Sequence, residues 1–117
     1  MNLLEGKTAL IFGVANDHSI AWGSAQALRA HGARLAFSYA GEALERRVRP
    51  LAESVGATFV EPCDVADDAQ IEALLARARA ELQHIDCLVH AIAYAGRDEL
   101  SRPFTETSRQ GFQTAME

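Results

Sequence analysis

Short apolar runs alternate along this chain with longer segments whose apolar residues recur at helical spacing. The apolar runs occupy residues 8–12, 34–39, 58–60 and 87–92. Helical periodicity marks the segments between them, at 19–30, 44–55 and 67–82. A strand buried on both faces reads as a short apolar run, and regular alternation with helices is typical of parallel sheets. We therefore predict an α/β fold, a Rossmann-like parallel sheet of about four strands with helices on both faces.

Spacing within the helical segments predicts which residues are buried. The predicted buried stripes are Ile20, Gly23, Ala27 and Ala30 in the first helix, Leu44, Val48, Leu51, Ala52 and Val55 in the second, and Ile71, Leu74, Leu75, Ala78 and Leu82 in the third. Asp67 and Gln70 have the spacing of a capping box at the start of the third helix. Thr107 or Ser108 is expected to begin a last helix, and Trp22 is expected to be a packing residue.

The acidic balance of the chain limits its partners. Its formal net charge is −5, whereas nucleic acids and anionic membranes are bound by clustered Lys and Arg. The basic residues at 46, 47 and 49 are interleaved with glutamates, which predicts a solvated helix face. No apolar run approaches the roughly 20 residues of a membrane span. Neither a nucleic-acid partner nor a membrane is expected.

The start of the chain and its cysteines favour a cytoplasmic protein. Residues 1–10 lack the basic start and long apolar stretch of a signal peptide. Cys63 and Cys87 lie in apolar segments, as buried thiols do in a reducing compartment. The four histidines stand singly, without a second ligand at metal-binding spacing, so no metal site is expected.

The loop after the first predicted strand carries the candidate chemistry. Gly13 permits a tight turn where a side chain would block a ligand, and Ser19 is a good N-cap for the next helix. The free N–H groups of a first helical turn can bind a pyrophosphate. Ala21 and Gly23 are small enough for a close approach. This pattern predicts a phosphate-binding loop, and the alternative is an ordinary strand–turn–helix with a capping serine.

The loop resembles that of the bacterial enoyl-[acyl-carrier-protein] reductases of type II fatty acid synthesis, a branch of the short-chain dehydrogenases. That family's loop reads G-V-A-x-x-x-S-I-A-x-G, as does this chain from Gly13 to Gly23. Further family blocks match in order: L-x-G-K at 4–7, G-A-x-L-A-F-[ST]-Y at 32–39, C-D-V at 63–65 and V-H-[SA]-I-[GA]-[FY]-A at 89–95. The resemblance implies that residues 1–117 are the N-terminal part of a single dinucleotide-binding Rossmann domain.

The resemblance also implies roles for individual residues. Gly13, Ser19 and Ile20 would contact the phosphates and ribose of the cofactor, Asp64 and Val65 would hold the adenine, and Ile92 would lie beside the nicotinamide-side ribose. The full implied cofactor-binding set is Gly13, Ala15, Ser19, Ile20, Ala40, Asp64, Val65, Ala91, Ile92 and Ala93. Tyr94 and Ala95 would border the acyl pocket. The alternatives are a turn cap for Asp64, a core position for Ile92 and a surface aromatic for Tyr94.

NADH is the expected cofactor, because no Arg or Lys stands at position 40 or 41 to bind a 2′-phosphate and Glu42 would repel one. The implied reaction is reduction of the trans-2 double bond of an enoyl thioester carried on acyl carrier protein. A tyrosine would protonate the developing enolate and a lysine would hold the cofactor ribose.

Tyr39, Tyr94 and Lys7 do not fit that catalytic pair, so we expect it beyond residue 117, with the helices that build the family's homotetramer. No catalytic residue is expected in this chain, which we interpret as a fragment inactive by itself. Another short-chain oxidoreductase, acting on a ketone, and a non-catalytic nucleotide-binding chain are the alternatives.

Overall fold

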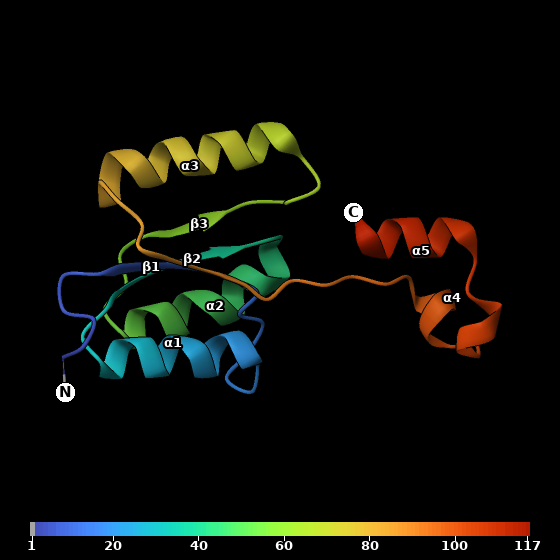
Figure 1. Ribbon diagram of the computed structural model, residues 1–117, viewed down its shortest axis with the longest axis horizontal. Coiled ribbons are helices and arrows are strands. Elements are labelled where there is room, and N and C mark those ends of the chain that lie inside the picture. The colour runs from blue at the N-terminus through green and yellow to red at the C-terminus, as the bar shows by residue number, and fades with distance from the viewer. Residues whose placement is uncertain (1) are drawn as a thin grey trace.

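Four parallel strands lie between two layers of helices in the computed structural model, which describes residues 2–117 (Figure 1). The strands are β1 (Thr8–Phe12), β2 (Arg34–Tyr39), β3 (Val60–Pro62) and β4 (Cys87–His90). The helices are α1 (Ile20–Ala30), α2 (Glu42–Ser54), α3 (Asp68–Leu82), α4 (Arg97–Leu100), the 3-10 helix η1 (Phe104–Glu106) and α5 (Arg109–Met116). The predicted fold class is confirmed.

The strand order is β3-β2-β1-β4, so β2 and β4 lie on opposite sides of β1. Phe12 pairs with Ser38 on one side and with His90 on the other. The carboxyl ends of these three strands therefore meet at one edge, at the point where the strand order reverses. Ligands of open α/β sheets bind outside the carboxyl ends of the strands at such a point.

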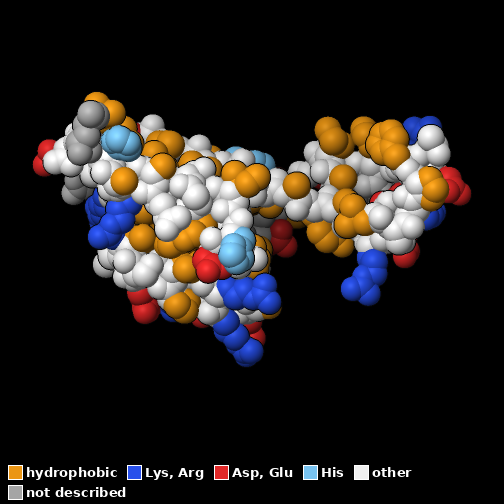
Figure 2. Space-filling model, turned by 90° about the horizontal axis from the view of Figure 1, so that it is seen from below, with side chains coloured by type: hydrophobic (Ala, Val, Ile, Leu, Met, Phe, Trp, Pro, Cys, Tyr) orange, Lys and Arg blue, Asp and Glu red, His pale blue; other side chains and the backbone are white. Residues whose placement is uncertain are grey.

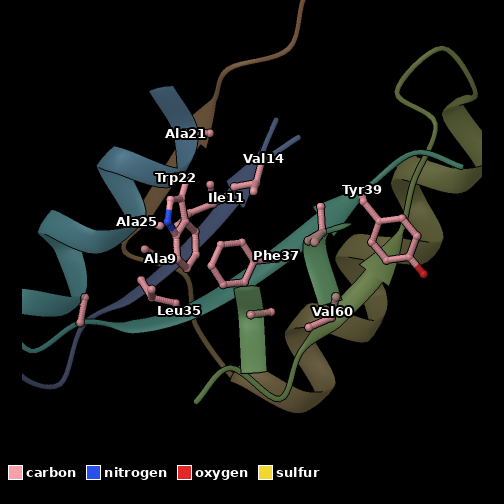
Figure 3. Close-up of a cluster of buried hydrophobic side chains, with 13 residues drawn as sticks. Ala9, Ile11, Val14, Ala21, Trp22, Ala25, Leu35, Phe37, Tyr39 and Val60 are labelled. Atoms are coloured by element: carbon pink, nitrogen blue, oxygen red, sulfur yellow. The ribbon is translucent and has the colours of Figure 1, made fainter. Parts of the chain in front are cut away.

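Two apolar clusters hold the helices against the sheet. On the face covered by α1 and α2, the indole of Trp22 packs against the ring of Phe37, with ring centroids 6.2 Å apart (Figure 3). On the face covered by α3, Leu10, Phe59 and Leu74 are fully buried. Burial of a side chain of this size contributes about 1.5–3 kcal/mol. Packing on both faces thus fixes the strand ends that form the edge.

The predicted buried stripe of α1 is wrong. Ala21, Trp22 and Ala25 face the sheet, whereas Ile20 is 86% exposed and Gly23, Ala27 and Ala30 are also exposed. The large indole decides the orientation, because burying it removes far more apolar surface from water than burying alanines or a glycine. The α2 stripe is confirmed as buried or half-buried, and in α3 only Leu75 departs from the prediction, at 43% exposed.

The bounds of two strands also differ from the prediction. β3 lies two residues later than 58–60, and β4 ends at His90 rather than at residue 92, because its pairing with β1 stops opposite Phe12. At the start of α3, the Asp67 side chain accepts from the N–H of Ala69. The side-chain oxygen of Gln70 accepts from the N–H of Asp64 rather than from that of Asp67, so the predicted capping box does not form. Ser108 is confirmed as the N-cap of α5. None of the helices within residues 2–117 is long and apolar enough to cross a membrane.

Candidate nucleotide-binding site

A cleft of about 790 Å³ opens at the carboxyl edge of the sheet. It is lined by the last residues of β1, β2 and β4, by the residues that follow each of the four strands, by Leu44 of α2 and by the last residues of the chain, 114–117. In Figure 1 this edge faces α5, which runs back toward the sheet. Figure 2 shows the segment that carries α4 and α5 projecting from the body of the molecule, with a hollow between the body and this segment. The cleft is therefore bounded by the sheet on one side and by α5 on the other.

Gly13 closes the end of β1 against β4. Its φ of +109° lies in the region that favours glycine, and a Cβ there would collide with the backbone carbonyl of Ala91. The Ala91 N–H also donates to the Phe12 carbonyl, at 3.1 Å. The need for glycine thus arises inside the protein, from the close approach of two strand ends. This contact was not foreseen from the sequence, which suggested only that a side chain would block a ligand.

The N-terminus of α1 presents free donors beside this turn. The Ser19 hydroxyl accepts from the Trp22 N–H at 3.3 Å and donates to the Asn16 carbonyl at 2.8 Å. The N–H groups of Ile20 and Ala21 donate no hydrogen bond within residues 2–117. These two groups and the positive end of the helix dipole suit an anion. For a bound anion, Ser19 would act chiefly as a helix cap, since its hydroxyl proton is already donated to Asn16.

Asp64 follows β3 on the other side of the cleft. One of its carboxylate oxygens accepts from the Ala66 N–H at 3.0 Å, which forms a turn. Its other oxygen accepts no hydrogen bond within residues 2–117. The geometry of Asp64 is therefore consistent with both interpretations. It caps a turn, and its second oxygen is free to accept a hydrogen bond from an amine.

The cleft floor between these two sides carries two buried polar groups. The Ser38 hydroxyl is buried without a hydrogen-bond partner in the described part of the chain. Burial raises the pKa of the Cys63 thiol, with a smaller contribution from Asp64. A protonated thiol is a poor nucleophile. The floor therefore offers packing and polarity rather than nucleophilic chemistry.

Residues 91–95 leave β4 along the cleft. Ala91 and Ala93 are exposed, Ile92 and Ala95 are half-buried, and the Tyr94 side chain is 66% exposed. Tyr94 lies between the cleft and a smaller hollow of about 290 Å³ that runs between α4 and α5. Its exposure fits a residue that either borders a pocket or lies on the surface, as both interpretations of the sequence allowed.

The comparison with protein families decides among the classes of protein that could carry such a cleft. A family model described as enoyl-(acyl carrier protein) reductase matches residues 13–117. The chain belongs to this family. The family predicted from the sequence blocks is therefore confirmed.

Three similar proteins illustrate the extent of the match. Enoyl-[acyl-carrier-protein] reductase [NADH] 2 of Rhizobium meliloti is 46% identical over 97% of this chain and 42% of its own length. The crystal structure of the Bacillus cereus reductase with NADP+ and indole naphthyridinone is 47% identical, with a TM-score of 0.92 over 98% of this chain and 46% of that one. The structure of the Anaplasma phagocytophilum reductase in complex with NAD is 42% identical, with a TM-score of 0.90 over 97% and 44%. The chain thus spans under half the length of these relatives.

The structure brings together most of the residues that the sequence pointed to. The cleft lining includes Gly13, Ala15, Ala40, Asp64, Val65, Ala91, Ile92, Ala93 and Tyr94. Ser19, Ile20 and Ala95 lie outside the lining. Ser19 and Ile20 stand at the α1 N-terminus, and Ile20 projects into solvent.

Sequence reasoning missed the contribution of α5. Residues 114–117 line the cleft, although they are far from the glycine loop in the sequence. A short final helix carries no motif that points to a site. It enters the cleft only because the chain folds back after α4. No group of three or more His, Cys, Asp or Glu within residues 2–117 is arranged to hold a metal ion.

Proposed function

We propose that residues 1–117 are the N-terminal, cofactor-binding part of a single Rossmann domain in an NADH-dependent enoyl-[acyl-carrier-protein] reductase. The observation that carries this proposal is the cleft at the strand-order reversal, which collects the family's motif residues from four separate loops. Its residues fit a dinucleotide, since two free N–H groups at α1 suit a pyrophosphate and an open carboxylate oxygen at Asp64 suits an adenine amine.

In this proposal each loop has a stated task. Gly13, Ala15, Ser19 and Ile20 bind the phosphates and the adjoining ribose, Ala40 faces the adenosine ribose, and Asp64 and Val65 hold the adenine. Ala91, Ile92 and Ala93 line the nicotinamide half, and Tyr94 and Ala95 border the acyl chain. A bound NADH would supply a hydride for the enoyl double bond. The substrate would be a trans-2-enoyl thioester on acyl carrier protein.

Tyr39 and Lys7 are not placed to form the catalytic tyrosine–lysine pair. The Tyr39 hydroxyl donates to Glu45 at 2.5 Å, and burial, helped by this bond, raises the pKa of Tyr39. Lys7 precedes β1, at the opposite end of the sheet from the cleft, where it lies 4.0 Å from Asp86. We therefore assign the catalytic tyrosine and lysine to another part of a longer, cytoplasmic, homotetrameric enzyme. The same observation makes a purely nucleotide-binding role for this chain alone the second candidate.

Glu42 and Glu45 support the preference for NADH over NADPH. No basic side chain stands between the end of β2 and α2, where Ala40 and Gly41 are followed by Glu42. Arg49, one turn further on, lies 3.8 Å from the Glu45 carboxylate. A 2′-phosphate at this end would meet acidic groups first, which is unfavourable in partly desolvated surroundings.

Steady-state reduction by the full-length polypeptide tests the proposal. We expect crotonyl thioester to be reduced with NADH, and the value of kcat/KM with NADPH to be at least ~10-fold lower. Consumption of NADH with an oxoacyl thioester but not with crotonyl thioester would instead identify a ketone reductase.

Ser19→Ala should raise the Kd for NADH about 10-fold by loosening the α1 N-terminus. Ser24→Ala, on the same helix, is the matched control and should leave the Kd unchanged.

A further inference from the structure

The segment formed by residues 96–117 sets its own internal geometry. Within residues 2–117, all of its hydrogen bonds are made inside the segment, and none reaches the sheet or the helices that cover it. The direction in which α5 leaves α4 is therefore determined locally. This direction matters because α5 runs back to the cleft and places residues 114–117 in its wall (Figure 1).

Glu99, on α4, makes the contacts that join α4 to α5. One carboxylate oxygen accepts from the Ser108 N–H at 3.0 Å, and the other accepts from the Ser108 hydroxyl at 2.5 Å and from Arg102 at 2.8 Å. The Ser108 hydroxyl in turn accepts from the Gly111 N–H at 2.9 Å, which caps α5. The Glu99 side chain is only 12% exposed. We call this set of hydrogen bonds the Glu99 clip.

Gly111 leaves the space that the clip needs. A Cβ at this position would overlap the Glu99 carboxylate, so the carboxylate lies directly against the first turn of α5. A carboxylate suits this place because its two oxygens accept from two donors of Ser108 at once. A glutamine offers a single acceptor oxygen, and its amide group would face a donor. The clip therefore needs the charged side chain and the glycine together.

We infer that Glu99 is a positioning residue for the cleft: by fixing the start of α5 against α4, it directs residues 114–117 to form the outer wall of the cleft, beside Tyr94. Glu99 itself does not line the cleft. That this wall contacts the acyl chain rests on the proposed function. The geometry of the clip does not depend on it.

Hydrogen exchange in the 117-residue chain tests the clip directly. In Glu99→Gln, the amides of Ser108 and Gly111 should exchange at least ~10-fold faster, as loss of a charge-assisted hydrogen bond predicts. Asp98→Asn is the matched control, because the neighbouring Asp98 carboxylate makes no hydrogen bond in the described part of the chain. Ser108→Ala removes the hydroxyl that accepts from Gly111 and should speed exchange at that amide, whereas Ser108→Thr retains a hydroxyl and should keep its exchange slow. Unchanged exchange in Glu99→Gln overturns the inference.

Kinetics of the full-length polypeptide test the consequence for the cleft. Glu99→Gln should raise KM for crotonyl thioester about 5-fold, with kcat and the Kd for NADH changed by less than ~2-fold. A purely structural loss would instead lower kcat, weaken NADH binding and lower the melting temperature as well. An unchanged KM would overturn the positioning role. If the wild-type protein reduces no enoyl thioester, the proposed function fails, and the exchange rates alone decide on the clip.

Discussion

At the scale of single residues, Gly13 and Ser38 at the carboxyl edge of the sheet have opposite effects on the stability of the fold. Gly13 is required, because the turn from β1 brings its Cα against the Ala91 carbonyl. Ser38 has a hydroxyl that is buried without a partner in residues 2–117, and such a group costs free energy. Both lie at the cleft, where a site residue can retain strain or an unpaired group that a purely structural position would not.

Gly13→Ala should destabilise the protein by at least ~3 kcal/mol and abolish NADH binding. Backbone strain at positive φ costs about 1–2 kcal/mol, and the collision with Ala91 adds to it by forcing β1 and β4 apart. Gly6→Ala is the control, because Gly6 has a φ of +80° but open space around a Cβ. Urea unfolding should show a larger loss of unfolding free energy for Gly13→Ala than for Gly6→Ala. Equal losses would show that backbone strain alone accounts for the need for glycine at position 13.

Ser38→Ala should raise the stability of the ligand-free protein by about 1 kcal/mol, since it removes the desolvation cost of the buried hydroxyl without leaving a large cavity. Thermal unfolding followed by the fluorescence of Trp22, the one tryptophan in the sequence, measures the change. Ser24→Ala should leave the melting temperature within about 1 °C. A lower melting temperature for Ser38→Ala would mean that a bound water satisfies the hydroxyl.

At the scale of elements, the sequence predicts what is periodic and local. The alternation of elements predicted the fold class, the α2 stripe was found from its large aliphatic residues, and the predicted glycine loop lies in the cleft lining. The predicted orientation of α1 was wrong because it counted small residues equally with Trp22, although the indole, as the largest apolar group, decides which face is buried. The role of α5 could not be predicted, since it depends on Glu99 meeting Ser108 across an intervening turn.

Acid should release α5 before the body of the protein unfolds. The hydrogen bonds from the Ser108 hydroxyl and N–H lower the pKa of the Glu99 carboxyl from its usual value, which is about 4.3 in model peptides. Because the pKa is lowered in the folded state, the clip is fully formed above that usual value and is lost as the pH falls through the lowered pKa.

Amide NMR signals of Ser108 and Gly111, followed from pH 6 down to pH 3, should report this release. Trp22 fluorescence should still be that of the folded body at the midpoint. Glu99→Gln provides the control, because it should show no such step. Simultaneous loss of the amide signals and the Trp22 signal would argue that the segment is held by the body rather than by the clip.

At the scale of the whole molecule, the chain divides into a well-packed sheet with its covering helices and a projecting segment with an exposed apolar surface. Leu100, Phe104, Phe112 and Met116 of that segment are each more than half exposed. Leu88 is also 53% exposed, on β4 at the edge of the sheet. Apolar patches of this kind mark surfaces that contact other protein. The proposed phosphate and adenine ends of the cleft, by contrast, are built on buried strands.

The 117-residue chain should therefore bind NADH at least ~100-fold more weakly than the full-length polypeptide, because the nicotinamide end of its cleft is walled only by α5 and residues 91–95. The adenine end is complete in our proposal, so ADP should lose much less affinity than NADH between the full-length polypeptide and this chain. Isothermal titration of both ligands against both proteins measures the two ratios. Low-micromolar binding of NADH to the 117-residue chain would show that the nucleotide site is already whole within these residues, and it would favour a nucleotide-binding role for the chain by itself.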